Sequence, residues 1–491
     1  MTPMRSHLKR TFSKRNFSRF MVVLLGFCVG LGAKAQESGG IQVGVGRSGS
    51  WQQQLRNSLN EKGIYLSLVY TGDAVATLTG GNRRGLTGLG VADIIALVEL
   101  EPVLGWRNAT LGIDLVGIHG QDPGRYTGDL QGVSNIAAPA AVRLYEWWIQ
   151  QRLFSDRLSV LAGAYDLNAS FDVIETGVLF LNGSAGMGPD FAAHGRNGAP
   201  TYPYPALGVR VGTRLSERLS LQAALTDGVP GDPRDPESTS FRFATGEGVL
   251  LCAELDYVVG TEQLTVLPPV SRRVQNRRGR VGFPRGRGWG GERGSGSGRG
   301  WGAGRGWGRF RGGLEEPGIE VPAETYRKVA LGLWRSTCEF MTAPPPGGPG
   351  TGLQKGTWGG YLLAERILSF TPEEPGRYVS GFVRAGFADH RVNPVDAYIG
   401  LGIVRSQAFI GHDQDQIGLA LMAAHAGDPV QAAAGTGGGS HDWEIACELT
   451  WRTRINAWFA LQPDLQYIMH PGCDPARANA LVIGLRMELA L

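Results

Sequence analysis

The final stretch of the chain alternates strictly between apolar and other side chains. Gly484 and Glu488 would share the apolar face if this stretch were a helix, whereas a strand places them on the opposite face. The alternation therefore predicts a β-strand over residues 479–491. The apolar positions are Leu481, Ile483, Leu485, Met487, Leu489 and Leu491, and between them stand Val482, Gly484, Arg486, Glu488 and Ala490.

Similar period-two runs recur along most of the chain and predict about sixteen strands. Most of these runs cover 9 to 12 residues, the length that a tilted strand needs to cross a lipid bilayer. The predicted strands are 63–71, 91–100, 109–119, 141–152, 158–166, 206–215, 218–227, 248–259, 325–336, 358–368, 378–388, 397–405, 415–425, 443–452, 457–468 and 479–491.

The gaps between these strands differ in length in a regular way. Short gaps such as Ser216-Glu217 alternate with long gaps rich in Gly, Pro and Asp, such as Gly228–Ser240. Short turns on one side and long loops on the other are typical of outer-membrane β-barrels. Because backbone groups in hydrocarbon need partners within the protein, such strands must close into a barrel. A water-soluble β-sandwich has the same alternation, with its apolar face against a second sheet.

Residues 1–35 have the pattern of a secretory signal peptide, which favours the barrel over the sandwich. A basic segment without acids precedes the short apolar stretch Met21–Ala33, and Ala33-Lys34-Ala35 matches the small-residue cleavage site. We expect cleavage before Gln36. The apolar stretch is too short to favour the alternative, a single anchoring helix.

Residues 277–313 differ in composition from the rest of the chain. They contain 10 Arg, 16 Gly and one acid, Glu292, with three interleaved Trp residues. Such a segment cannot bury a core, so we expect a disordered loop inserted in the barrel. The tract and the signal peptide carry enough positive charge to leave a formal charge of −12 on the other 419 residues. The whole-chain charge of +4 therefore hides an acidic barrel, and export argues against nucleic acid as a partner.

The sequence argues against an enzyme and against a helical membrane protein. No apolar run approaches 18 residues, and no nucleophile or metal-ligand signature is present. The match to G-x-G-x-x-G at Gly44–Gly49 is not followed by a βαβ unit. Cys252, Cys338, Cys447 and Cys473 form no C-x-x-C pair, so we expect small buried side chains, no metal and no cofactor.

The polar face of the strands supplies the candidate pore-lining residues. In a barrel that face surrounds the lumen, where hydrogen-bonding groups and charge set selectivity. The alternation does not decide whether Arg143, Glu146, Trp147 and Trp148 face the lumen or the lipid. Trp148 is equally compatible with a pore-lining side chain and with an anchor at the membrane interface. The candidate pore-lining residues are Arg210, Arg214, Glu254, Asp256, Arg384, Glu444, Glu448, Gln462, Asp464, Gln466, Arg486 and Glu488.

A series of short motifs runs along nearly the whole mature chain. They are Trp51, Leu55, Gly63-Ile64, Gly80-Gly81-Asn82, Arg143–Trp148 with Gln150-Gln151, Gly163, Phe171, Phe180-Leu181-Asn182, Tyr202-Pro203, Gly208, Ala223, Asp227-Gly228, Glu254, Gly332, Trp334, Gly360-Tyr361, Asp415–Leu419, Glu444, Glu448, Leu461–Tyr467, Pro471-Gly472 and Gly484-Leu485-Arg486. In order and spacing these motifs resemble the carbohydrate-selective porin (OprB-like) family. The Arg/Gly tract and the terminal Leu491 depart from the family pattern.

This resemblance implies an all-β transmembrane antiparallel barrel of about sixteen strands over residues 36–491, with a short N-terminal helix. It implies passive diffusion of small sugars across the bacterial outer membrane, with outer-membrane lipid and lipopolysaccharide around a monomer or homotrimer. The alternative function is a structural or adhesive outer-membrane barrel whose basic loop binds surface polysaccharide or lipopolysaccharide.

Overall fold

The computed structural model describes residues 55, 57–243, 246–260, 326–342, 352–371, 374–409, 415–434, 441–456 and 458–490. The signal peptide, the Arg/Gly tract and Leu491 lie outside these residues. The chain divides into two units, residues 1–64 and 65–491. In the first unit residues 57–61 form a short helix, which confirms the helix expected near the N-terminus.

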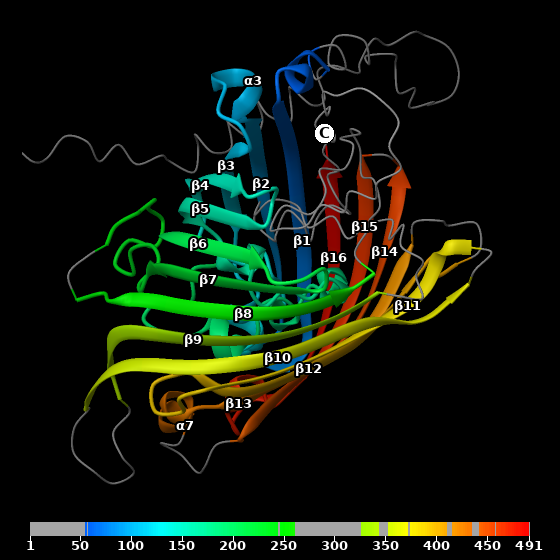
Figure 1. The fold of residues 1–491 in the computed structure, drawn as a ribbon. Helices are drawn as coiled ribbons and strands as arrows, with labels where there is room; N and C mark the ends of the chain where they lie inside the picture. The colour runs from blue at the N-terminus through cyan, green and yellow to red at the C-terminus, as the bar shows by residue number, and fades with distance from the viewer. Residues whose placement is uncertain are drawn as a thin grey trace, which may run out of the picture. The chain divides into compact units, whose positions relative to one another are not determined.

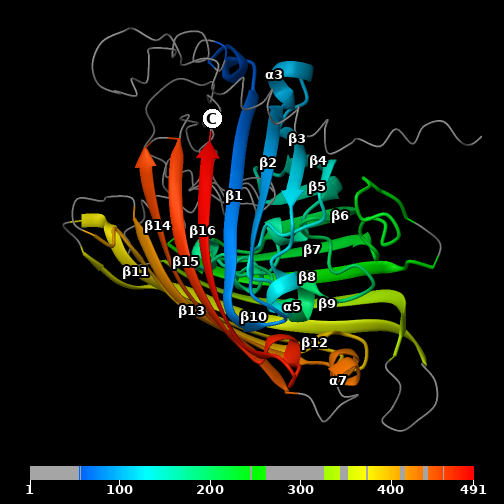
Figure 2. The same cartoon turned by 180° about the vertical axis from the view of Figure 1, so that it is seen from behind.

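Sixteen antiparallel strands close into a barrel (Figures 1 and 2), which confirms the predicted fold. Each strand pairs with its neighbours in sequence, and β1 pairs with β16 to close the ring. The strands are β1 (Ile64–Gly81), β2 (Gly85–Glu99), β3 (Ala109–Gly120), β4 (Ala141–Leu153), β5 (Leu158–Tyr165), β6 (Ala206–Arg214), β7 (Leu219–Asp227), β8 (Val249–Val259), β9 (Arg327–Met341), β10 (Leu353–Thr371), β11 (Glu374–Ala388), β12 (Val395–Ser406), β13 (Gln416–Ala426), β14 (Trp443–Asn456), β15 (Phe459–Met469) and β16 (Ala478–Ala490).

Short helices occur in the connections between strands. Within the described residues no helix is both long and apolar enough to cross a membrane. The α-helices are α3 (Leu100–Leu104), α4 (Gly124–Thr127), α5 (Pro189–Ala192) and α7 (Asp428–Ala434), and the 3-10 helices are η1 (Leu167–Ala169), η2 (Thr176–Leu179), η3 (Gly183–Ala185) and η6 (Pro471–Cys473).

The outer surface of the barrel is apolar and its inner surface is largely polar. On β8 the side chains of Leu251 and Leu255 are 43% and 38% exposed, whereas Cys252 and Glu254 between them are 6% and 1% exposed. Since successive strand residues point to opposite faces, the exposed leucines face outward and Glu254 faces the interior. The same alternation holds at Arg210, which is buried between exposed Val209 and Val211.

Connections of different length lie at opposite ends of the barrel. Residues 154–157, 215–218, 372–373 and 457–458 connect even-numbered strands to the next odd-numbered strand, and this end is called the short-turn rim. β8 ends at Val259 and β9 begins at Arg327 on the same rim. The longest connections that are described in full, residues 121–140 and 166–205, belong to the opposite rim.

Candidate functional site

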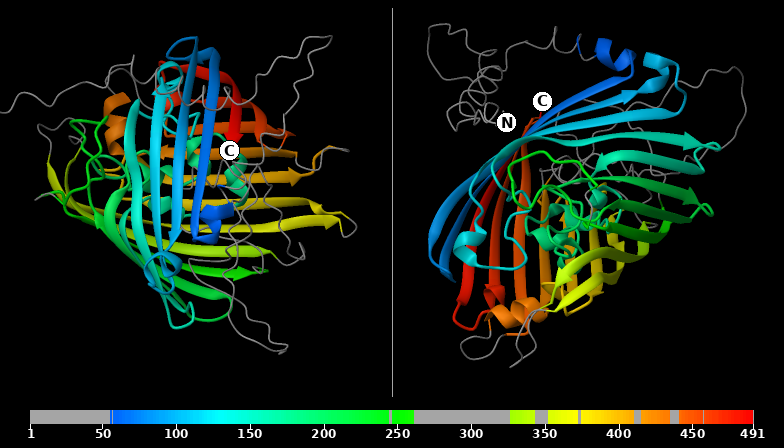
Figure 3. Two further views of the ribbon diagram at one scale, coloured as in Figure 1. Left: turned by 90° about the horizontal axis from the view of Figure 1, so that it is seen from above. Right: turned by 90° about the vertical axis from the view of Figure 1, so that its left-hand side faces the viewer.

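The two long connections at residues 121–140 and 166–205 are called the β3–β4 segment and the β5–β6 segment. Both fold inside the ring of strands, as the right panel of Figure 3 shows. Within the β5–β6 segment, α5 contacts β10, β11 and β12, and η2 contacts β11 and β12. Those strands lie far around the ring from β5 and β6, so the segment crosses the interior of the barrel.

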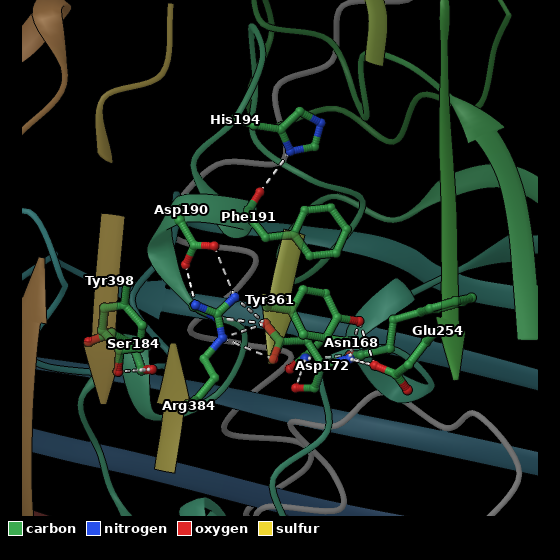
Figure 4. Close-up of polar contacts among 12 residues, drawn as sticks. Asn168, Asp172, Ser184, Asp190, Phe191, His194, Glu254, Tyr361, Arg384 and Tyr398 are labelled. Atoms are coloured by element: carbon green, nitrogen blue, oxygen red, sulfur yellow. Dashed lines mark hydrogen bonds and ion pairs between the residues drawn. The ribbon is translucent and has the colours of Figure 1, made fainter. Parts of the chain in front are cut away.

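Arg384 on β11 binds the β5–β6 segment through two carboxylates (Figure 4). Its Nε and Nη2 donate to Asp172 at 3.1 and 2.9 Å, and its Nη1 and Nη2 donate to Asp190. The side chains of all three residues are fully buried. The guanidinium carbon also lies 5.2 Å from the ring centroids of Tyr361 and Tyr398, a distance suited to cation–π attraction. These contacts define the Arg384 clamp: Arg384, Asp172, Asp190, Tyr361 and Tyr398.

Hydrogen bonds on two sides complete the contacts around the Arg384 clamp. The backbone N–H of Asp172 donates to Glu254 Oε2 at 2.7 Å, and the Tyr361 hydroxyl donates to the same carboxylate. On the other side, the Tyr398 hydroxyl donates to the Ser184 carbonyl at 2.7 Å. Strands β8, β10, β11 and β12 therefore all contribute side chains that fix the segment.

Gly188 approaches the clamp too closely for any side chain. A Cβ at this position would lie 2.1 Å from Cζ and Nη1 of Arg384. We therefore expect Gly188→Ala to displace the guanidinium, at the cost of about 1–3 kcal/mol typical of overpacking. The temperature at which the barrel loses its heat-modifiable mobility in a denaturing gel should fall.

Gly88→Ala is the matched control for Gly188→Ala. The nearest neighbour of its added Cβ would be the Asp73 carbonyl oxygen, at 3.9 Å. That variant should unfold at the wild-type temperature. Equal unfolding temperatures for Gly188→Ala and Gly88→Ala would contradict the close packing around Arg384.

Inward-facing glutamates also hold the backbone of the β5–β6 segment. Glu448 on β14 accepts from the N–H groups of Leu181 and Asn182 at 2.6 and 3.0 Å. A carboxylate that accepts two backbone donors satisfies polar groups that would otherwise be buried without partners. The carboxylates that bind this backbone from the wall are Glu146, Glu254, Glu365 and Glu448.

Glu444 on β14 holds the β3–β4 segment in the same way. Its carboxylate accepts from the backbone N–H groups of Leu130, Gln131 and Gly472, at 2.8, 3.1 and 2.6 Å. The first two donors belong to the β3–β4 segment, and the third lies between β15 and β16. One buried carboxylate therefore joins the segment to the long-loop end of the wall.

Arg486 on β16 fixes the other part of the β3–β4 segment. Its Nε and Nη2 donate to the two oxygens of Asp73 on β1, both at 2.8 Å. Nη2 also donates to Asn135, and the Ser134 hydroxyl donates to Asp73 at 2.7 Å. The ion pair therefore joins β16 to β1 where the barrel closes. The hydrogen bonds of Arg486 and Asp73 to Asn135 and Ser134 attach the β3–β4 segment at the same place.

An aromatic cluster packs beside the clamp and is uncharged. The ring of Phe191 lies against His194, Trp334 and Tyr361, with centroid distances of 5.6, 5.2 and 6.0 Å. Burial lowers the pKa of the His194 imidazole to about 4. His194 Nδ1 lies 2.7 Å from the Phe191 carbonyl, an acceptor, so this nitrogen carries the proton of the neutral ring.

The candidate pore-lining residues fall into three groups in the structure, and their part in sugar passage stays a prediction. Arg214 is half-buried and the other eleven are buried. Asp256, Asp464 and Glu488 bond to neighbouring wall residues. The residues that contact the two inner segments are Arg210, Glu254, Arg384, Glu444, Glu448, Gln462, Gln466 and Arg486.

Several residues of the site are absent from the prediction. Asp172 and Asp190 lie in a connection, where alternation gives no direction. Glu365 shares its face with Tyr361, Leu363 and Ile367, so that run shows no clear polar side. The available signal was its even spacing from Leu363 and Tyr361, which are two and four residues away on the same strand.

The structure places the ambiguous tryptophans on opposite faces of β4. Trp148 is buried and packs over Gly112, whereas Trp147 is exposed and contacts Phe241. An interfacial anchor therefore fits Trp147 and not Trp148. The register shifts between Asp114 and Leu115, where β4 has an extra residue, and this change of phase explains why strict alternation fails there.

No metal site is found among the described residues. No group of three His, Cys, Asp or Glu side chains there could hold an ion, and the four described cysteines are free. The polar side chains of the barrel interior form hydrogen bonds and ion pairs.

A closed sixteen-stranded barrel with an apolar exterior and long connections folded into a polar interior defines a porin-type channel. The sequence profile of the family described as "Carbohydrate-selective porin, OprB family" matches residues 83–491. The chain belongs to this family. It is a sugar-passing porin of the bacterial outer membrane.

Individual proteins are also similar to this chain in sequence or in fold. Porin B of Pseudomonas aeruginosa is 24% identical over 485 residues, which cover 90% of each chain. The high-pH structure of Pseudomonas putida OprB superposes with a TM-score of 0.69 at 18% identity, covering 90% of this chain and 97% of that one. The low-pH structure of the same protein gives a TM-score of 0.50 at 15% identity, with 91% and 98% covered.

Proposed function

We propose that sugars diffuse passively through the interior of this barrel, and that the β5–β6 segment sets which solutes pass. The observation that carries this proposal is the fixation of that segment across the interior by the Arg384 clamp and the wall glutamates. A rigid polar element in a channel fixes both its width and its hydrogen-bonding groups, the properties that control selectivity.

The pairing of three interior arginines supports a neutral solute. Arg384 is bound by two aspartates, Arg486 by Asp73, and Arg452 by Glu488. Opposite charges in direct contact leave little net field from these three arginines to attract an anion. The wall would then interact with a sugar through its hydrogen-bond donors and acceptors.

The candidate pore-lining residues would act in two ways. Those that contact the inner segments would position the surfaces that a sugar meets, and the others would belong to the solvated wall. Neither role involves a chemical reaction, and we propose a channel without catalytic activity. Residues 1–35 would be removed on export, and the barrel would function as a monomer or a homotrimer in contact with outer-membrane lipid and lipopolysaccharide.

Conductance in a planar bilayer tests the function directly. The purified barrel should give stable channels whose ion current falls when neutral mono- or disaccharides are added, because sugar in the lumen displaces ions. Uptake of the same sugars into liposomes should separate those that pass from those that only block. The heat-unfolded protein is the control, and a folded barrel without conductance would contradict the proposal.

A further inference from the structure

The outward face of β9 carries an arginine at each end of an apolar stretch. Val329, Leu331 and Leu333 are 42%, 50% and 57% exposed, and exposed Arg327 and Arg335 flank them on the same face. The two arginines are eight residues apart, or about 27 Å along a strand. At the usual tilt of such strands this is about 20 Å across the membrane, near the height of the apolar band. Arg327 and Arg335 therefore lie near the two surfaces of the hydrocarbon layer.

The partners of these arginines on β10 differ in kind. Trp358 pairs with Arg335, and Arg366 pairs with Arg327. The first pair places an aromatic ring beside a cation at one surface. The second places two exposed arginines directly opposite each other, an arrangement that is destabilising without an anion between them.

A third arginine lies near this pair on the short-turn rim. Exposed Arg218 precedes β7, and the Tyr257 side chain on β8 interacts with both Arg218 and Arg327. Strands β7 to β10 are consecutive in the ring, so these groups gather on one outward surface. Arg218, Arg327 and Arg366 together are called the arginine triad.

The acids on the adjacent turns do not neutralise the arginine triad. Glu374 pairs with Arg377 at 2.7 Å, and Glu217 supplies one negative charge against three positive ones. Within the described part of the chain, no carboxylate forms an ion pair with Arg327 or Arg366. The exposed apolar side chains of Val329 and Leu368 lie two residues from Arg327 and Arg366 on the outward face, so the surroundings of the triad are lipid.

We infer that the arginine triad binds the phosphate of an anionic phospholipid in the periplasmic leaflet. Short turns of outer-membrane barrels face the periplasm, which places the triad at that leaflet. Guanidinium groups bind phosphate oxygens by paired hydrogen bonds, and their positive charge favours an anionic headgroup. This inference rests on the proposed function only for the position of the barrel in the outer membrane.

Native mass spectrometry of the full mature barrel in detergent tests the inference, with phosphatidylglycerol as the probe. The wild type should retain one lipid at micromolar concentration. The double variant Arg327→Gln/Arg366→Gln should bind this lipid with an affinity lower by about tenfold or more. Arg335→Gln is the matched control, because it removes an outward arginine of the same strand at the other surface. It should retain lipid like the wild type.

Three results would overturn the lipid site. They are equal retention by the double variant, equal retention of phosphatidylcholine by the wild type, and displacement of the lipid by an equal concentration of inorganic phosphate. The double variant should keep its heat-modifiable mobility and its sugar uptake, which separates loss of the lipid site from failure of the porin function. If it does not fold, Arg218→Gln provides the same comparison.

Discussion

Arg384→Met is expected to release the β5–β6 segment from the far wall of the barrel. The substitution leaves Asp172 and Asp190 buried without their cation, a change that typically costs 3–5 kcal/mol. Since 1.4 kcal/mol is tenfold in an equilibrium constant, the bound arrangement should lose on the order of a hundredfold or more in population. The strands themselves remain paired, so the barrel should persist while its interior widens.

Single-channel recording checks this expectation for Arg384. The variant should show larger or fluctuating conductance and weaker discrimination between small and large sugars. Arg405→Met, at an exposed outward position, is the matched control and should behave like the wild type. Arg384→Met combined with Asp172→Asn and Asp190→Asn should recover part of the stability, because no buried charge is then unpaired. Wild-type conductance and selectivity in Arg384→Met would contradict the clamp.

Glu444→Ala is expected to destabilise the barrel where the β3–β4 segment meets the wall. Three backbone N–H groups lose their acceptor, and each unsatisfied buried donor costs about 1–3 kcal/mol. Glu444→Gln should cost less, since its amide oxygen can still accept. The order of stability should therefore be wild type, then Gln, then Ala.

The heat-modifiable mobility of the barrel in a denaturing gel reports this order. Limited proteolysis should also cut the β3–β4 segment of Glu444→Ala faster, because Leu130 and Gln131 lose their attachment. Glu237→Ala removes an exposed glutamate from a connection and should leave both measurements unchanged. Equal unfolding temperatures for the Glu444 and Glu237 variants would show that these hydrogen bonds do not stabilise the wall.

The strands were predictable because alternation is a local property of the sequence. All sixteen predicted runs correspond to strands of the barrel, and β16 agrees to within one residue at each end. The largest difference is β1, predicted to end at residue 71 and observed to continue to Gly81. The sequence Gly72-Asp73 resembles a turn, but Asp73 faces the interior and pairs with Arg486 from the last strand.

The interior was less predictable because its contacts join distant parts of the chain. Alternation placed Arg384 on the polar face correctly, but nothing in its strand indicates that Asp172 and Asp190 lie beside it. Those aspartates are separated from it by 212 and 194 residues. The direction of a connection depends on what it packs against, and a single sequence contains no pattern that reports such packing.

The long separation within the clamp also constrains the order of folding. The β5–β6 segment is complete early in the chain, but Tyr361, Arg384 and Tyr398 of the clamp arrive only with β10, β11 and β12. The clamped part of the segment must therefore wait until those strands have assembled. Docking of this segment is then a late event, and we expect its variants to affect the rate of unfolding more than the rate of barrel closure.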